Sequence, residues 1–403
     1  MKRLLVHHLN DVIEIATQIR YVAVATTLVA GVAFFASMQG CGYAYKTCSS
    51  CPPPTKQLQF VYTANSAGTP STVAALTVDP VKGSLSAIGG SPYSTGSGSI
   101  ALAADPSSKF VYVANALSSN ISAFTINQTS GALTQIAGSP FPGEAGMNSI
   151  AIDPTGQFLY AVTGNSNNLW IYSINTTTGA LASLSSTPVA LAANTVSNFI
   201  EFDPSGSFIY VAARGSTSSA IYAFSRDNST GAVTALSGFP VALDGLANRG
   251  AFEPTGTFLL VTGTNVFGTA GGVDVFSVNA TSGALTLTAP PTQVGDDPAG
   301  VVVATGVVYV PNTSDATISA FTLNFNTGAL TAVSGSPFPS GGQGSVNGPV
   351  GITTATAGNF VFVCNASNDI SVFSVSPGGA LIPVSGSPFS VGGSAPSAIT
   401  FVP

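Results

Sequence analysis

A short aromatic and β-branched run recurs seven times at a nearly constant interval along this chain. The copies read FVYTAN, FVYVAN, FLYAVT, FIYVAA, FLLVTG, VVYVPN and FVFVCN. Their third residues are Tyr62, Tyr112, Tyr160, Tyr210, Leu260, Tyr309 and Phe362, which are 50, 48, 50, 50, 49 and 53 positions apart. A sustained period of this length marks a repeat protein, in which each unit buries its apolar face against its neighbours. The chain is therefore expected to fold as seven copies of one module.

Each copy contains four predicted strands. An apolar strand that ends in an Asp-Pro or Glu-Pro turn, as in SIAIDPTGQ and GAFEPTGT, precedes the aromatic run. An alternating strand such as ISAFTIN follows it, and then come a TSGAL-type turn and a last strand that runs into Ser-Pro-Phe or a relative of it. Four strands per repeat is the composition of a propeller blade. The predicted fold class is all-β, a seven-bladed β-propeller with four-stranded blades.

The two ends of the repeat region predict that the ring closes on itself. The first copy begins at its second strand, with Gln59 and Phe60, and has no first strand of its own. The chain finishes with SAITFVP, a first strand that lacks a second. We therefore expect residues 397–402 to complete the blade that begins at Phe60, which removes both open sheet edges.

Two features inside the repeats are interpreted as structural. Asp105, Asp153, Asp203 and Glu253 stand before Pro once per blade, and we expect them to cap backbone N–H groups in the turns. Cys364 stands where FVYVAN has Ala, so a small buried apolar role is expected for it.

The N-terminal segment is interpreted as a targeting segment. Residues 21–37 form a run of 17 without a charge, preceded by Arg20, which is typical of an export signal or a short membrane anchor. Gly40 and Cys41 then resemble the lipobox of bacterial lipoproteins, in which the Cys is acylated. We therefore predict an export signal or membrane anchor over 1–40, lipidation at Cys41, a Cys- and Pro-rich tether over 41–58, and the propeller over 59–403. An uncleaved anchor is the alternative to the lipoprotein.

Charge excludes two classes of partner. Only 6% of the side chains are charged, where about 25% is usual. Beyond position 58 there are five basic and fourteen acidic residues, so the net charge of that region is 5 − 14 = −9. A surface with so few basic residues cannot bind along a phosphate backbone, which excludes nucleic-acid binding. For the same reason it is not attracted to an anionic bilayer. Membrane contact is expected through the N-terminal lipid or anchor only. The protein is expected to be a monomer and to use no metal or cofactor.

The blade motifs DPxGxFVYVAN, ISAFTIN and TGAL resemble those of the seven-bladed lactonase family, which includes the propeller-type 6-phosphogluconolactonases, and they are also similar to those of YVTN-type surface propellers. The resemblance covers residues 59–403. It implies hydrolysis of a sugar lactone or a related cyclic ester on the face where the strand 2–3 loops and the blade-to-blade crossovers gather. Family members carry His, Arg and Glu there. This chain keeps Arg249 in the segment ANRGAF, but its propeller contains no histidine.

Lactone opening needs a base that activates water and a positive group where the carbonyl oxygen becomes anionic. Arg214 and Arg249 are expected on loops of neighbouring blades, and Glu201 replaces an Ala on a strand that should line the central channel. Two residue sets follow from this reasoning. The predicted catalytic residues are Arg249, Arg214, Glu201 and Asp244, and the predicted binding residues are Glu144, Asn248, Asp296 and Asp297.

Three alternatives stay open. A hard cation on Asp296, Asp297 and Glu144 ranks last, because no known ligand spacing supports it. The charges can be interpreted instead as solvated loop residues, with Arg249 paired to Asp244. A non-catalytic ring would then serve as a binding platform for a protein or glycan in the bacterial cell envelope, either periplasmic or at the surface. Convergence of Arg214, Arg249 and a carboxylate in one pocket favours an enzyme, and dispersed charges on a shallow face favour a platform.

Overall fold

The computed structural model describes residues 58–164, 166–184, 189–191, 195–216, 218–243, 245–265, 271–341 and 348–403. The export segment, Cys41, most of the tether and Asp244 lie outside these ranges. Within the described ranges every regular element is a β-strand. Accordingly, that part of the chain contains no helix with the length and apolarity to cross a membrane.

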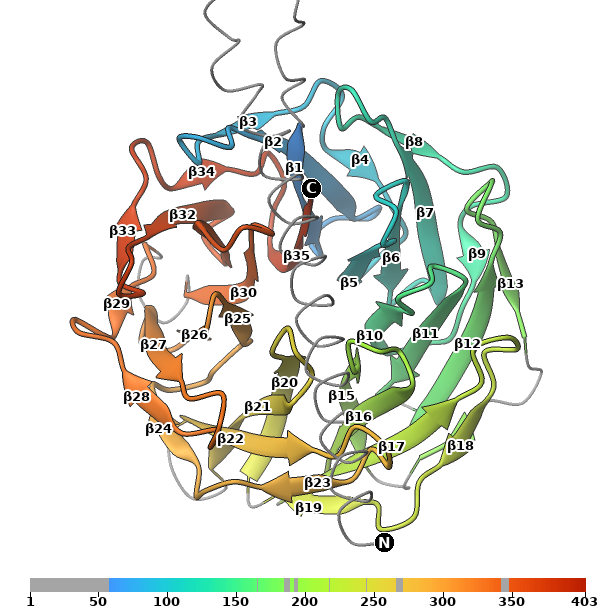
Figure 1. Ribbon diagram of the computed structural model, residues 1–403. Helices are drawn as coiled ribbons and strands as arrows, with labels where there is room; N and C mark the ends of the chain where they lie inside the picture. Colours follow the sequence, from blue (N-terminus) through green and yellow to red (C-terminus); the bar gives the residue numbers. More distant parts are fainter. Residues whose placement is uncertain are drawn as a thin grey trace, which may run out of the picture. The chain divides into compact units, whose positions relative to one another are not determined.

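The strands form seven antiparallel sheets, which are the blades of a ring (Figure 1). Blade 1 contains β35 (Pro396–Val402), β1 (Gln59–Asn65), β2 (Thr72–Val78), β3 (Leu85–Ala87) and β4 (Tyr93–Ser94). Blade 2 contains β5 (Ser99–Ala104), β6 (Phe110–Asn115), β7 (Asn120–Ile126), β8 (Leu133–Gln135) and β9 (Phe141–Pro142). Blade 3 contains β10 (Met147–Ile152), β11 (Phe158–Thr163), β12 (Asn168–Ile174), β13 (Leu181–Ser183) and β14 (Val189–Ala190). Blade 4 contains β15 (Val196–Phe202), β16 (Phe208–Arg214), β17 (Ser219–Arg226), β18 (Val233–Ala235) and β19 (Val241–Leu243).

The remaining three blades follow the same order. Blade 5 contains β20 (Gly245–Phe252), β21 (Phe258–Asn265), β22 (Gly271–Val278), β23 (Leu285–Leu287) and β24 (Thr292–Val294). Blade 6 contains β25 (Val302–Ala304), β26 (Val307–Asn312), β27 (Thr317–Leu323), β28 (Leu330–Ala332) and β29 (Phe338–Pro339). Blade 7 contains β30 (Pro349–Thr354), β31 (Phe360–Asn365), β32 (Asp369–Val375), β33 (Leu381–Pro383) and β34 (Phe389–Ser390). The seven-bladed all-β propeller is thus confirmed.

The fourth strand of each blade is broken into two short pieces. In blade 2, β8 and β9 both pair with β7, opposite Phe124 and Ile121 respectively. Ser139 lies in the break, where its Oγ accepts a hydrogen bond from the backbone N of Ala123 at 2.8 Å. The hydroxyl therefore replaces the backbone acceptor that the interrupted strand cannot supply. The equivalent serines Ser91, Ser336 and Ser387, each followed by Pro and an aromatic residue, make the same contact.

The chain terminus closes the ring as predicted. β35 pairs antiparallel with β1, and Phe60 lies opposite Val402. Figure 1 shows the two strands side by side, in red and blue. Ser397 Oγ also donates to the carbonyl oxygen of Ser99 in blade 2 at 2.7 Å. The last strand of the chain therefore joins the first blade and contacts the second.

Each interface between blades has its own apolar core. Seven clusters of buried residues occur in the described part of the chain, and each draws on two adjacent blades. At the interface of blades 2 and 3, Tyr112 donates its hydroxyl proton to the carbonyl oxygen of Gly179 at 2.9 Å. Gly179 has a φ of +75°, and a Cβ there would lie 2.6 Å from the Phe110 ring. Only glycine combines this backbone conformation with so close an approach, which explains the Gly of the repeated TGAL turn.

The acidic residues of the strand 1–2 turns are structural, as expected. Asp105 Oδ1 accepts hydrogen bonds from the backbone N of Lys109 and Phe110 at 2.7 and 2.6 Å. Asp153 binds Gln157 and Phe158 in the same way. Cys364 is fully buried, in agreement with its expected apolar role.

Candidate functional site

The innermost strand of each blade faces a cavity of about 440 Å³ at the centre of the ring. Most of its lining is apolar or small, including Ala103, Ile150, Val302 and Ile399. Among the described lining residues, Glu201 and Arg249 alone carry a charge. The central channel therefore presents one acidic and one basic side chain among uncharged, mostly small residues.

Glu201 lies on β15 and lines this channel, as predicted. It pairs across the sheet with Tyr210, at the register position that Ala103 and Ala151 hold in blades 2 and 3. Burial raises the pKa of the Glu201 carboxyl from 4.5 to about 8, and the positive charge of Arg249 opposes that shift. A carboxyl group with a pKa close to neutral exchanges a proton readily under ordinary conditions.

Arg249 lies within β20, on the neighbouring blade. Its Nη1 donates a hydrogen bond to the carbonyl oxygen of Asn198, three residues before Glu201 on β15. The hydroxyl of Thr262 donates to the Arg249 carbonyl oxygen at 3.1 Å, which holds the backbone that carries the guanidinium. Burial lowers the pKa of Arg249, and Glu201 counters this effect. The two charges therefore act on each other across the interface of blades 4 and 5.

Arg214 and Asn248 form a separate contact. Arg214 Nη1 donates to Asn248 Oδ1 at 3.1 Å, and Asn248 Nδ2 donates to the carbonyl oxygen of Pro298 in the next blade at 2.9 Å. The expectation that both arginines lie on loops is wrong, because Arg214 ends β16 and Arg249 is inside β20. For Arg214 the physical reason is that blade 4 extends its second and third strands by one residue pair, Arg214 and Ser219, and Arg249 is inside a strand because it pairs with Thr262 of β21.

The remaining predicted residues lie on separate crossovers. Glu144 is half-buried between β9 and β10, whereas Asp296 and Asp297 lie between β24 and β25. Asp296 donates its backbone N–H to Asp315 Oδ2 at 2.7 Å. In the described ranges no three His, Cys, Asp or Glu residues gather in a way that could hold a metal ion. Asp244 lies outside the described residues, so its pairing with Arg249 stays a prediction.

The sequence reasoning named Asn248 as a binding residue but missed the series of asparagines on the innermost strands to which it belongs. Asn148, Asn198 and Asn248 each occupy a β-bulge and donate Nδ2 to a carbonyl oxygen of the next blade, at 3.1, 2.7 and 2.9 Å. Their spacing of 50 residues in the sequence is the signal that identifies them. The series holds β15 and β20 together where Glu201 and Arg249 meet.

Fold and channel define this chain as a seven-bladed propeller of the lactonase type. The sequence model of the family described as "Lactonase, 7-bladed beta-propeller" matches residues 92–198 and 184–304. Together these segments span more than half of the chain, which therefore belongs to that family. No curated protein matches the sequence.

Solved structures share the fold at low sequence identity. A 6-phosphogluconolactonase-like protein of Bacteroides fragilis has a TM-score of 0.70 and 17% identity, over 88% of this chain and 100% of that one. A similar protein of Bacteroides uniformis has a TM-score of 0.71 and 17% identity, over 86% and 99%. The periplasmic gluconolactonase of Pseudomonas aeruginosa has a TM-score of 0.67 and 16% identity, over 86% and 99%. At these identities the likeness concerns the fold alone.

Replacing Glu201 with glutamine is expected to change how stability depends on pH. The folded state keeps the Glu201 proton up to about pH 8, whereas the unfolded chain loses it near 4.5. Stability should therefore be highest below the unfolded pKa and fall as pH rises toward the folded pKa, by at most about 5 kcal/mol over that window. Urea unfolding of both proteins between about pH 5 and pH 8 measures the difference. Since residues 59–403 contain no histidine, parallel curves for parent and variant would contradict the assigned pKa.

Proposed function

We propose that this protein hydrolyses a sugar lactone or a related cyclic ester, and that the reaction takes place in the central channel. The observation that supports this proposal is the placement of Glu201 and Arg249, the two charged side chains of the described lining, on neighbouring strands of the central cavity. The raised pKa of Glu201, at about 8, suits a group that must both take and return a proton. Membership of the lactonase family points to the same class of reaction.

In the proposed reaction the Glu201 carboxylate takes a proton from water as the water oxygen bonds to the lactone carbonyl carbon. The Arg249 guanidinium donates hydrogen bonds to the oxyanion that forms. The ring C–O bond then breaks, and the proton on Glu201 moves to the leaving oxygen. The product is a hydroxy acid, and Glu201 is again a carboxylate. Removal of the Glu201 and Arg249 side chains from water strengthens the attraction between guanidinium and oxyanion.

The test is hydrolysis of a panel of sugar δ-lactones and unsubstituted γ- and δ-lactones, followed in a pH-stat and corrected for spontaneous opening. We expect kcat/KM to rise with pH through about 8, the pKa of Glu201. Both Glu201→Gln and Arg249→Met should lower it by about 10²-fold or more. Asp227→Asn is the matched control, since Asp227 lies in an exposed turn where other blades use Asn127, Asn175 and Asn279. Equal rates for Glu201→Gln and parent would overturn the proposal.

A binding platform is the second candidate function. It is supported by the separation of Glu144 from Asp296 and Asp297 on different crossovers and by the contact that occupies Arg214. Charges spread in this way, on a surface rich in Ser, Thr and Asn, suit a protein or glycan partner in the cell envelope. A parent protein that is inactive on the whole lactone panel would favour this candidate.

We also propose that the protein is exported and anchored through a lipid on Cys41. The expected result is incorporation of labelled fatty acid into the expressed protein and its loss in Cys41→Ala, because the acyl chain is attached to that thiol. Cys48→Ala is the control and should keep the label. Unchanged labelling of Cys41→Ala would remove the lipoprotein and leave the uncleaved anchor over residues 21–38.

A further inference from the structure

Polar side chains on the innermost strands tie neighbouring blades together at four places in the described ring. Each of these residues occupies the β-bulge of its strand. Its side chain donates a hydrogen bond to a carbonyl oxygen near the start of the next blade's innermost strand. The donors and their acceptors are Ser397 and Ser99, Asn148 and Ser197, Asn198 and Ala247, and Asn248 and Pro298. The bulge side chains therefore link blades around the channel.

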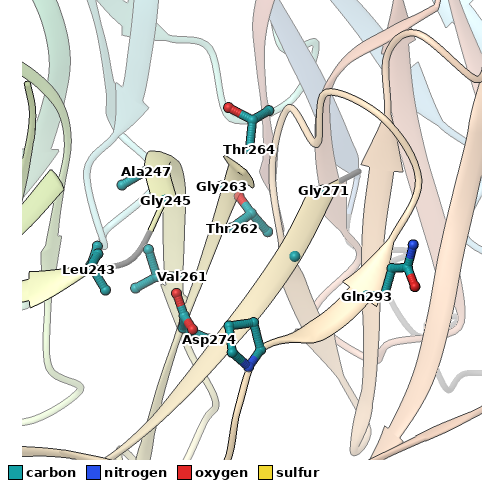
Figure 2. Close-up of a pocket in the computed structure, with 12 residues that line it drawn as sticks. Leu243, Gly245, Ala247, Val261, Thr262, Gly263, Thr264, Gly271, Asp274 and Gln293 are labelled. Atoms are coloured by element: carbon teal, nitrogen blue, oxygen red, sulfur yellow. The ribbon is translucent and has the colours of Figure 1, made fainter. Parts of the chain in front are cut away.

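Asn198 makes two contacts with β20 instead of one. Its Nδ2 donates to the carbonyl oxygen of Ala247 at 2.7 Å, and its own carbonyl oxygen accepts a hydrogen bond from Arg249 Nη1. Ala247 and Arg249 lie on either side of the β20 bulge, where they pair with Gly263 and Thr262 of β21. Figure 2 shows Ala247 and Thr262 on these two neighbouring strands. Asn198 therefore holds β20 on both sides of its bulge.

The second contact depends on the residue that follows the bulge. In blade 5 that residue is Arg249, whereas the equivalent residues of blades 2 and 4 are Ala101 and Phe199. The side chains of alanine and phenylalanine have no hydrogen-bond donor. Asn148 thus donates to Ser197 at 3.1 Å as Asn198 donates to Ala247, but it faces no guanidinium. Blades 3 and 4 therefore contain the amide contact without the arginine contact.

Asn198 and Glu201 lie three residues apart on β15. The strand that carries the acidic side chain of the channel therefore also holds the basic one. The interaction between two charges depends on the distance between them. The contact of Asn198 with Arg249 accordingly sets how strongly the guanidinium acts on Glu201 and on an oxyanion that forms beside it.

We propose that Asn198 is a positioning residue of the channel, which holds the Arg249 guanidinium beside Glu201 at the place where the lactone oxyanion forms. The Asn198 amide fixes the backbone of β20 through Ala247, and the Asn198 carbonyl oxygen fixes the direction of the guanidinium. The effect on the reaction rate rests on the proposed lactone hydrolysis, whereas the position of the guanidinium can be measured without it. A displacement of about 1 Å is enough to lower the rate of an oriented reaction by up to about 10²-fold.

The first test compares lactone hydrolysis by the full chain, by Asn198→Ala and by Asn198→Ser. Asn198→Ala should lower kcat by about tenfold with little change in KM, because Arg249 acts on the oxyanion and not on the bound lactone. Asn198→Ser should recover most of this loss. Its hydroxyl can replace the amide, since Ser397 makes the equivalent contact from the bulge of blade 1 at 2.7 Å.

The second test follows Glu201 without a substrate. Arg249 lowers the pKa of Glu201 against the effect of burial, so a displaced guanidinium should raise it above the parent value of about 8. In urea unfolding between about pH 5 and pH 9.5, the stability of Asn198→Ala should then continue to fall to a higher pH than that of the parent. Glu201 and Arg249 are the two charged side chains of the described lining, so the difference reports their interaction.

Asn148→Ala is the matched control. It removes the same kind of amide contact from the neighbouring pair of blades, so it should leave the pKa of Glu201 at the parent value. Thermal unfolding of each variant confirms that it is folded. Asn198→Leu, which is close to asparagine in volume and has no donor, takes the place of Asn198→Ala where the smaller side chain prevents folding.

Three outcomes would overturn the proposal: a pKa of Glu201 that does not rise in Asn198→Ala, an equal rise in Asn148→Ala, or an Asn198→Ser variant that behaves like Asn198→Ala. A parent protein that hydrolyses no lactone would contradict the proposed function instead. The unfolding measurements would still decide whether Asn198 positions Arg249.

Discussion

Replacing Asp153 with alanine is expected to lower the free energy of unfolding by about 3–5 kcal/mol, because it leaves a buried arginine without its counter-ion. Asp153 Oδ2 accepts a hydrogen bond from Arg226 Nη1 at 3.0 Å, and the side chains of Arg226 and Asp153 are 1% and 0% exposed. Without the carboxylate, Arg226 keeps the carbonyl oxygen of Gly206 at 2.7 Å and the ring of Phe202, 5.8 Å from its guanidinium carbon, but no ion-pair partner among the described residues. This ion pair joins blades 3 and 4.

Asp105→Ala is the matched control for this prediction. Asp105 makes the same turn contacts in blade 2, but Ile174 stands in blade 3 where Arg226 stands in blade 4. Urea unfolding should show a loss at Asp153 that exceeds the loss at Asp105 by about 2 kcal/mol. The double variant Asp153→Ala with Arg226→Ile should remove the excess, since an apolar residue fits that position in other blades. Equal losses for the two aspartate variants would contradict a stabilising role of the ion pair.

Deleting residues 396–403 is expected to abolish the cooperative unfolding transition. The deletion removes β35, the only partner of β1 on the channel side in the described chain, and exposes backbone from Phe60 to Asn65. It also removes the Phe401 ring, which stacks on Phe362 of blade 7 at 5.8 Å. An open ring has two unprotected sheet edges and loses two blade contacts at once. Differential scanning calorimetry should show no single transition for the shortened chain.

Two further samples make this result specific. Deleting Pro403 alone, an exposed residue beyond β35, should leave the transition unchanged. Adding a synthetic peptide of residues 396–403 to the shortened protein should restore part of it by strand addition. A shortened chain that unfolds at the temperature of the parent would show that ring closure adds nothing to stability.

The fold was predictable because the same pattern of strands and turns occurs in every repeat. The alternation of each strand, the turn residues and the constant period recur in seven copies, so an error at one copy is corrected by the others. The offset between Phe60 at the start and Val402 at the end then predicted the closure that the structure shows. The break in the fourth strand was missed, because the Ser-Pro-Phe serine acts through a side-chain contact with strand 3.

The candidate site was predictable only where a residue departs from its equivalents in the other blades. Glu201 stands where blades 2 and 3 have Ala, and this comparison placed it in the channel. The contact of Arg249 with the Asn198 carbonyl could not be predicted, because it depends on how far a long side chain reaches across an interface.

By itself the sequence determined the number of blades, the register of their strands and the pairing of the two ends of the ring, because these depend on local periodicity repeated along the chain. Only the tertiary structure decided which polar side chains interact. Arg249 acts electrostatically on Glu201, Arg226 binds Asp153, and Arg214 binds the amide of Asn248, each across an interface between blades. Such contacts depend on the distances between separate sheets, and no periodicity within one blade encodes those distances.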